Sequence, residues 1–236
     1  MQKPWGPEHG RSMSEPLRLL VKIPIRECGE PVVRIETRNP RLIARCKFPY
    51  LRARLIGMLE HAARVLPDDL SLMVTAAYRP VAEQRQAYEH YFARVRAEHP
   101  DWPLAVVRRR MNRYLAPVDA KVPAPHCTGG TVDVRILLPD GQDLDMGSTP
   151  KGALDVARWD SPKISAAARA NRQILWDAMT AAGFTNYRAE WWHWSFGDSG
   201  WAYRLGKPFA IYGLVDLQGL EAGVIPERPP RWKDRA

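Results

Sequence analysis

Residues 126–138 read His126-Cys127-Thr128-Gly129-Gly130-Thr131-Val132-Asp133-Val134-Arg135-Ile136-Leu137-Leu138. The apolar residues from 131 onward predict a strand over residues 131–138, and the Pro-Asp-Gly that follows predicts a turn. The two glycines before this strand let the backbone turn tightly, which would bring His126 back beside Asp133. An unpaired carboxylate in an apolar strand costs several kcal/mol, so we expect Asp133 to have a partner. A divalent cation shared with His126 would be such a partner.

A second motif places a glutamate and a histidine three residues apart in a row of indoles, Ala189-Glu190-Trp191-Trp192-His193-Trp194. The surrounding residues 187–196 predict a strand. Side chains three apart on an ideal strand point to opposite faces, so Glu190 and His193 can share a site only if the strand ends, twists, bulges or is locally helical there. A structural histidine hydrogen-bonded among tryptophans is the alternative interpretation.

Together the two motifs supply the ligands of a metal site. His126, Asp133 and His193 would give three nitrogen or oxygen ligands with one position left open, which is typical of catalytic zinc. Structural zinc sites are instead closed by four ligands, usually including cysteine. Cys127 is disfavoured as a ligand, because neighbours in an extended chain point apart.

The rest of the chain mixes helices and strands. A strand over residues 72–76 ends at Tyr78-Arg79-Pro80. Because strands and helices occur without a regular βαβ alternation, we predict an α+β fold with a central antiparallel sheet flanked by helices. Apolar residues at helical spacing predict helices over residues 50–66, 81–98, 103–115 and 165–182.

The length of 236 residues suits a single domain, residues 1–236. Residues 1–40 are rich in proline, glycine and charge, which predicts an extended N-terminal arm with one short strand near residues 31–36. No run of 18 apolar residues predicts a membrane span, and the first residues do not resemble a secretory signal. Three scattered cysteines do not indicate a disulfide framework. We therefore expect a cytoplasmic protein.

The net charge of +9 raises the question of nucleic acid. The densest basic run, Arg108-Arg109-Arg110, lies among apolar residues at helical spacing, which indicates the solvated face of an amphipathic helix. No zinc-finger spacing, RNP-like motif or lysine-rich tail is found. We expect no specific nucleic-acid partner and no membrane partner.

With both motifs in view, residues 50–213 resemble the D-alanyl-D-alanine dipeptidases of the VanX type. These belong to the zinc D,D-peptidases, together with D,D-carboxypeptidases and phage L-alanyl-D-glutamate endopeptidases. The resemblance rests on HxxGGxxD and EWWH, on the arginine of AAYRP, on Asp145-Met146-Gly147 and on the trailing WWHWSFGDSGWAYRLGKPFAIYG. It implies the hedgehog/D,D-peptidase-like architecture and a role in peptidoglycan metabolism. The tryptophan pair before His193 points to the dipeptidase branch.

Carried over residue by residue, the resemblance implies one zinc ion per chain. It implies that Glu190 is the general base and acid that handles the zinc-bound water, and that Arg79 is the electrophilic partner of the scissile carbonyl oxygen. It implies that Asp145 anchors the free ammonium of a small peptide substrate. The implied zinc ligands are His126, Asp133 and His193.

The chain also departs from the family pattern. Ala124 stands where the family usually has a serine that helps to hold the substrate carboxylate, and Thr131 stands where a smaller residue is usual. Residues 94–125 form a basic helix-and-loop insertion, and residues 214–236 form a proline-rich tail.

The sequence therefore favours a zinc-dependent dipeptidase for D-alanyl-D-alanine or a similar small dipeptide. One alternative keeps the zinc site and changes the substrate, giving a D,D-carboxypeptidase, a muropeptide endopeptidase or a peptidase of a biosynthetic pathway. The other alternative is a metal-holding or nucleic-acid-binding module without catalysis. Glu190 argues against that module, since a pure binding site needs no base.

Overall fold

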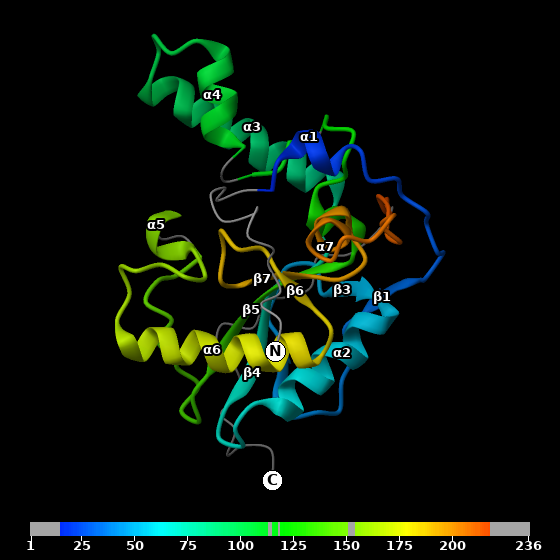
Figure 1. The fold of residues 1–236 in the computed structure, drawn as a ribbon, viewed down its shortest axis with the longest axis vertical. Coiled ribbons are helices and arrows are strands. Elements are labelled where there is room, and N and C mark those ends of the chain that lie inside the picture. The colour runs from blue at the N-terminus through cyan, green and yellow to red at the C-terminus, as the bar shows by residue number, and fades with distance from the viewer. Residues whose placement is uncertain (1–14, 113–114, 118, 151–153, 218–236) are drawn as a thin grey trace.

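The computed structural model describes residues 15–112, 115–117, 119–150 and 154–217 (Figure 1). Its centre is a five-stranded sheet in the order β2-β4-β5-β7-β6. Neighbouring strands are antiparallel except for the edge pair β2–β4, which is parallel. The α+β prediction with a largely antiparallel sheet is confirmed. The strands are β2 Leu42–Ala44, β4 Ser71–Ala76, β5 Thr131–Leu137, β7 His193–Ser195 and β6 Thr185–Asn186.

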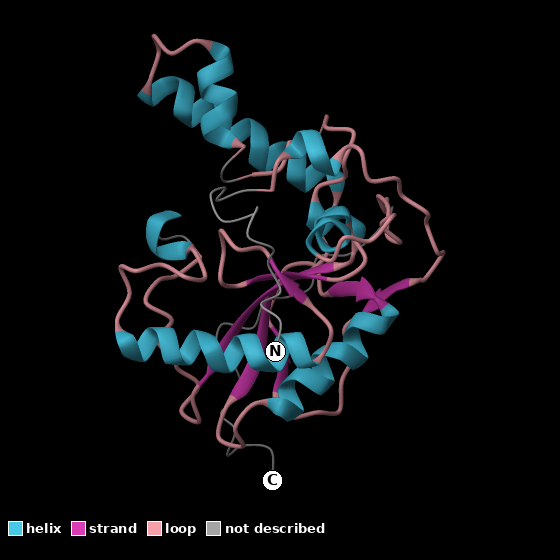
Figure 2. Ribbon diagram, viewed as in Figure 1, coloured by secondary structure: helices cyan, strands magenta, loops and turns pink. Residues whose placement is uncertain are grey.

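One face of this sheet carries the hydrophobic core. Alternate residues of β5, Val132, Val134 and Ile136, are fully buried in the main apolar cluster. The helices α2 (Ala53–Val65) and α6 (Ala166–Ala181) pack against each other and cover this face (Figure 2). Since side chains alternate along a strand, Asp133 lies on the opposite face of β5. The fold therefore separates the apolar core from the face on which Asp133 stands.

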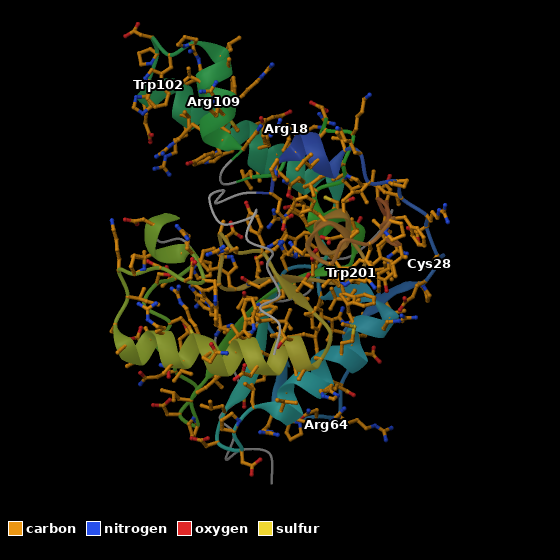
Figure 3. All side chains as sticks on the ribbon, in the orientation of Figure 1. Arg18, Cys28, Arg64, Trp102, Arg109 and Trp201 are labelled. Atoms are coloured by element: carbon orange, nitrogen blue, oxygen red, sulfur yellow. The ribbon has the colours of Figure 1, made fainter. Side chains whose placement is uncertain are left out.

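The helices α3 (Val81–Glu98) and α4 (Leu104–Met111) form a hairpin that projects from the body of the molecule (Figure 1). A small apolar cluster around Val107 and Met111 joins the two helices. The arginines 108–110 are exposed, and Figure 3 shows Arg109 and Trp102 on this projecting part. The interpretation of the basic run as a solvated helix face is confirmed.

Other elements differ from the predictions. The helix predicted from residue 50 begins only at Ala53, because β3 (Tyr50–Arg52) pairs with β1 (Val32–Arg34) in a separate two-stranded sheet. The strand β1 confirms the short strand predicted near residues 31–36. Short helices that were not predicted are α1 Leu17–Leu20, the 3₁₀ helix η2 Pro125–Thr128, α5 Leu154–Ala157 and α7 Ser199–Arg204.

No helix among the described residues is long and apolar enough to cross a bilayer. The first 14 residues of the predicted N-terminal arm and residues 218–236 of the predicted tail lie outside the described residues.

Candidate metal centre and active site

The turn between η2 and β5 places His126 next to Asp133. Gly129 ends η2 with φ +71°, a conformation that glycine adopts without strain. Gly130 is also required, because a Cβ there would lie 2.5 Å from the carbonyl oxygen of Phe196. His126 Nδ1 donates a hydrogen bond to Ala77 O over 2.7 Å, and Nε2 lies 3.4 Å from Asp133 Oδ1. The Nδ1 hydrogen bond thereby leaves the Nε2 lone pair free to bind a ligand.

A buried arginine holds this turn in place. Arg52, from β3, is 4% exposed and donates from Nε to Thr128 O over 2.9 Å. Its guanidinium also forms two hydrogen bonds of 2.9 Å with the carboxylate of Glu27. The N-terminal arm therefore supports the segment that carries His126.

The segment before β7 brings Glu190 and His193 to the same side. The strand begins only at His193, so the strand predicted over residues 187–196 is wrong for its first part. Instead, the Glu190 N–H donates to Tyr187 O and the His193 N–H donates to Glu190 O, which curls the chain into consecutive turns. Glu190 Oε2 consequently lies 3.7 Å from His193 Nδ1.

The three predicted ligands converge. His193 is the register partner of Asp133 across β5 and β7, and its Nδ1 lies 3.0 Å from Asp133 Oδ1. One ligand atom from each of His126, Asp133 and His193 lies within 4.8 Å of the others. Two imidazole nitrogens and one carboxylate oxygen are a donor set that suits zinc. Cys127 is not part of this group, and burial raises the pKa of its thiol to about 11.

Burial and charge set the protonation of these groups. Burial raises the pKa of the Glu190 carboxyl to about 7. Burial also lowers the pKa of His126, which favours the neutral imidazole that a metal ligand must be. Burial alone would raise the pKa of Asp133, but the neighbouring imidazoles outweigh it and lower that pKa. For His193, burial is outweighed by the hydrogen bond and charge of Asp133, which raise the pKa.

Arg79 is held beside this group by a residue that sequence reasoning missed. The Arg79 N–H donates to His126 O over 3.1 Å, and Arg79 Nη1 donates to Gln84 Oε1 over 2.8 Å. Gln84, in the first turn of α3, is 2% exposed and donates from Nε2 to Ala116 O over 2.8 Å. Gln84 thus connects the arginine to the loop that follows α4. The sequence signal that could have found Gln84 was its position in the first turn of the helix that follows Arg79.

These residues line a cleft with a volume of about 430 Å³. The residues that line it include His126, Asp133, His193, Glu190 and Arg79. The lining also includes apolar residues from α1 and from the loop after α4, among them Leu17, Leu20, Leu115 and Val122.

The structure does not bring Asp145 to this cleft. Its side chain is exposed and its Oδ1 accepts a hydrogen bond from the Gly147 N–H over 2.7 Å. Ala124, in the place of the family serine, does line the cleft. Thr131 is fully buried and donates from Oγ1 to Asp198 Oδ2 over 3.3 Å, so its hydroxyl supports the start of α7. Sequence reasoning also missed Glu15, Tyr187, Asp198 and Arg204, which line the cleft.

Comparison with known proteins identifies the family. A curated D-alanyl-D-alanine dipeptidase from Synechocystis sp. is 28% identical over 250 residues, covering 87% of this chain and 100% of that protein. A D-alanyl-D-alanine dipeptidase from Escherichia coli K12 is 33% identical over 76 residues, covering 32% of this chain and 39% of that protein.

A solved structure is also similar. It is a variant of the vancomycin resistance D,D-pentapeptidase VanY from a VanB-type resistance cassette, in complex with Zn(II). It is 15% identical, covers 79% of this chain and 94% of its own, and has a TM-score of 0.42. Residues 52–210 match the sequence profile of the peptidase M15 family, described as D-ala-D-ala dipeptidase. Because this match spans more than half of the chain, the chain is a peptidase that belongs to the M15 family of D-alanyl-D-alanine dipeptidases.

Proposed function

We propose that the protein is a zinc-dependent dipeptidase that hydrolyses D-alanyl-D-alanine or a similar small dipeptide. The observation that carries the proposal is the position of Glu190. Its carboxylate lies 3.7 Å from His193 Nδ1, in a cleft that also holds the other two members of a metal-ligand group. Neither a structural metal site nor a binding module requires a buried carboxylate there, whereas hydrolysis requires a base.

His126 Nε2, His193 Nδ1 and a carboxylate oxygen of Asp133 would hold one zinc ion per chain. The hydrogen bond from His126 Nδ1 to Ala77 O fixes the orientation of that ring, as second-shell partners of metal ligands commonly do. Zinc bound by such a set supplies a Lewis acid and lowers the pKa of a coordinated water to about 7.

Glu190 is the proposed general base and acid. Burial raises the pKa of its carboxyl to about 7, which is close to the value that best suits proton transfer at neutral pH. It accepts a proton from the attacking water and delivers that proton to the leaving amine. Trp192, also in the cleft wall, is 5% exposed, so apolar surface limits the access of other water to the carboxylate.

Arg79 is the proposed partner of the scissile carbonyl oxygen. Its guanidinium carries a fixed positive charge to the cleft, where it stabilises the negative charge that develops on this oxygen. The hydrogen bond to Gln84 restrains the guanidinium before substrate binds. Preorganised charge of this kind costs no reorganisation during the reaction.

The amino end of the substrate needs an anion, and the resemblance offers Asp145 for it. This assignment stays a prediction, because the side chain of Asp145 is exposed and accepts a hydrogen bond from the Gly147 N–H. Ala124 lines the cleft and offers no hydroxyl to the substrate carboxylate, so the substrate could differ from that of the dipeptidases. The second candidate function is therefore a D,D-carboxypeptidase or a muropeptide endopeptidase. The arrangement of residues 1–236 as one domain and the cytoplasmic location also stay predictions.

A substrate panel tests the proposal. The purified protein is incubated with D,D-, L,D- and L,L-dipeptides and with a muropeptide, with and without a chelator. We expect chelator-sensitive hydrolysis of D-alanyl-D-alanine or a related D,D-dipeptide. Hydrolysis of the muropeptide alone would favour the second candidate, and an absence of hydrolysis with full zinc occupancy would contradict both.

A further inference from the structure

A buried amide lies behind the segment that carries Glu190 and His193. Asn186, the last residue of β6, is fully buried and is the register partner of Trp194 on the neighbouring strand β7 (Figure 1). Its side-chain Nδ2 donates to Glu190 O over 3.0 Å, to His193 O over 3.0 Å and to Trp191 O over 3.3 Å. One side-chain amide therefore joins three carbonyls of the segment from 190 to 193.

The turns between β6 and β7 bring these carbonyls together. The Tyr187 N–H donates to His193 O over 2.9 Å, and the His193 N–H donates to Glu190 O over 3.2 Å. Carbonyl oxygens that point at one place repel one another, because each carries a partial negative charge. A group with two N–H donors at this place removes the repulsion, and the short planar side chain of asparagine supplies such a group.

The orientation of the Asn186 amide follows from its surroundings. Three oxygens around one end of the side chain require donors, so the NH2 group must face them. The other end is not satisfied, since Asn186 Oδ1 is buried and accepts no hydrogen bond from any described residue. An unpaired buried acceptor is destabilising, so a residue kept for packing alone would be better replaced by an apolar one. The two N–H donors are therefore what Asn186 contributes here.

The joined segment decides where two functional side chains point. Residues three apart on a regular strand face opposite sides, yet Glu190 Oε2 lies 3.7 Å from His193 Nδ1. The same Nδ1 lies 3.0 Å from Asp133 Oδ1. Asn186 binds the main-chain oxygens of both Glu190 and His193, and it is not among the described residues that line the cleft. Any effect of Asn186 on the reaction must therefore pass through the residues that it holds.

We propose that Asn186 is a positioning residue whose amide holds His193 in place for the metal and Glu190 in place for proton transfer. This inference rests on the proposed function and deepens it, because it names the group that fixes the general base relative to a metal ligand. Asn186 contacts the backbone alone, so its loss should weaken metal binding and slow turnover while leaving substrate affinity almost unchanged.

The test measures zinc affinity and turnover separately in Asn186→Ala. Competition with a chromophoric chelator gives the zinc dissociation constant, which should rise by about tenfold to a hundredfold, as for other groups that orient metal ligands. At saturating zinc, kcat for the best D,D-dipeptide should fall by about tenfold to a hundredfold, because the base is displaced from its working position. KM should stay within about threefold of the parent.

A second substitution separates the donors from the packing. Leucine has the branched shape of asparagine without its N–H groups, so Asn186→Leu fills the site and donates nothing. It should show losses at least as large as those of Asn186→Ala. If Asn186→Leu folds poorly, as judged by its circular dichroism spectrum, Asn186→Ala keeps the test available.

A double-mutant cycle distinguishes positioning from a general structural role. In the Glu190→Gln background the base is already gone, so adding Asn186→Ala should lower kcat by no more than about threefold further. Losses that multiply in full would show that Asn186 acts independently of Glu190.

Two control variants lie away from the cleft lining. Asn39→Ala removes an amide-to-carbonyl hydrogen bond of the same kind, from Asn39 Nδ2 to Glu60 O over 3.4 Å. Leu59→Ala opens a hole in the main apolar cluster and lowers stability without touching the 190–193 segment. Both controls should keep kcat and the zinc dissociation constant within about twofold of the parent.

Several results would overturn the inference. These are an unchanged kcat or an unchanged zinc dissociation constant in both Asn186 variants, parental kinetics in Asn186→Leu alone, or equal losses in Leu59→Ala. In each case the parent remains a peptidase. A parent that hydrolyses no substrate contradicts the proposed function instead, and the zinc dissociation constants of the Asn186 variants then still decide whether Asn186 holds His193.

Discussion

Arg79 Nη1 donates a hydrogen bond to Gln84 Oε1 over 2.8 Å, and both residues line the cleft that holds the metal-ligand group. Gln84 uses its other amide atom to donate to Ala116 O. A glutamine can serve both partners because it offers an acceptor and a donor on one planar group. The arginine proposed to act on the substrate carbonyl is therefore oriented by a buried, uncharged side chain.

Loss of this amide should impair catalysis without disturbing the metal. We expect Gln84→Leu to lower kcat/KM for the best dipeptide by about tenfold or more, because the guanidinium loses a charge-assisted hydrogen bond. The matched control is Gln86→Leu, an exposed position on the same helix, which should stay within about twofold of the parent. Equal kinetics in the two variants, with equal zinc content, would show that Gln84 does not position Arg79.

The metal assignment predicts about one equivalent of zinc per chain. A His126→Ala, His193→Ala double variant should lose this zinc, because only Asp133 of the converging group is left. Elemental analysis after removal of excess metal measures the content directly. His90→Ala, at an exposed position on α3, serves as the control and should retain full occupancy.

Full occupancy in the double variant would remove His126 and His193 from the metal site. Zinc binding by the parent should also weaken as the pH falls, because protons compete for the ligand nitrogens. A zinc affinity that does not change with pH would contradict an imidazole-based site.

The raised pKa of Glu190 predicts a pH-dependent stability in chelator-treated protein. Between 4.5, the ordinary pKa of a glutamate carboxyl, and about 7, the folded chain keeps a proton on this carboxyl that the unfolded chain has lost. The free energy of unfolding therefore falls as pH rises through this window. Glu190→Gln has no such carboxyl and does not lose unfolding free energy in this way. The free energy of unfolding of the variant minus that of the parent should therefore rise between pH 4.5 and 8, by at most about 3 kcal/mol.

Urea unfolding of both proteins at several pH values measures this difference. Glu89→Gln, which removes a charge from an exposed position on α3, should not reproduce the trend. A stability difference between Glu190→Gln and the parent that is the same at pH 5 and pH 8 would show that Glu190 is not held in a desolvating environment.

Elements with a long and regular apolar pattern were predictable from the sequence. The bounds of α3 match the prediction, and α6 begins after the cap at Ser165, whose hydroxyl accepts from the Ala168 N–H. Elements that depend on a distant partner were not. Residues 50–52 continue a helical apolar pattern, yet they form a strand because β1 supplies hydrogen bonds from the N-terminal arm. Local sequence does not encode that partner.

The same distinction applies to the site. His126 and Asp133 are joined by a short glycine turn, so their proximity follows from local geometry. The side-by-side arrangement of Glu190 and His193 required turns that a strand pattern does not reveal. Gln84 is one polar residue among many in α3, and Glu15 reaches the cleft only because the N-terminal arm returns to Arg204. Long-range packing therefore decides the positions of Gln84 and Glu15 in the cleft.

The central claim is that Glu190 transfers the proton in a zinc-dependent hydrolysis, and the turnover of Glu190→Gln on the best D,D-dipeptide tests it most directly. The amide preserves size and hydrogen-bonding reach but accepts no proton at neutral pH. General acid–base catalysis contributes about 10²–10⁴-fold, so kcat should fall at least about a hundredfold while zinc content stays at the parental level. A kcat within a few-fold of the parent, at equal zinc content, would remove Glu190 from the mechanism.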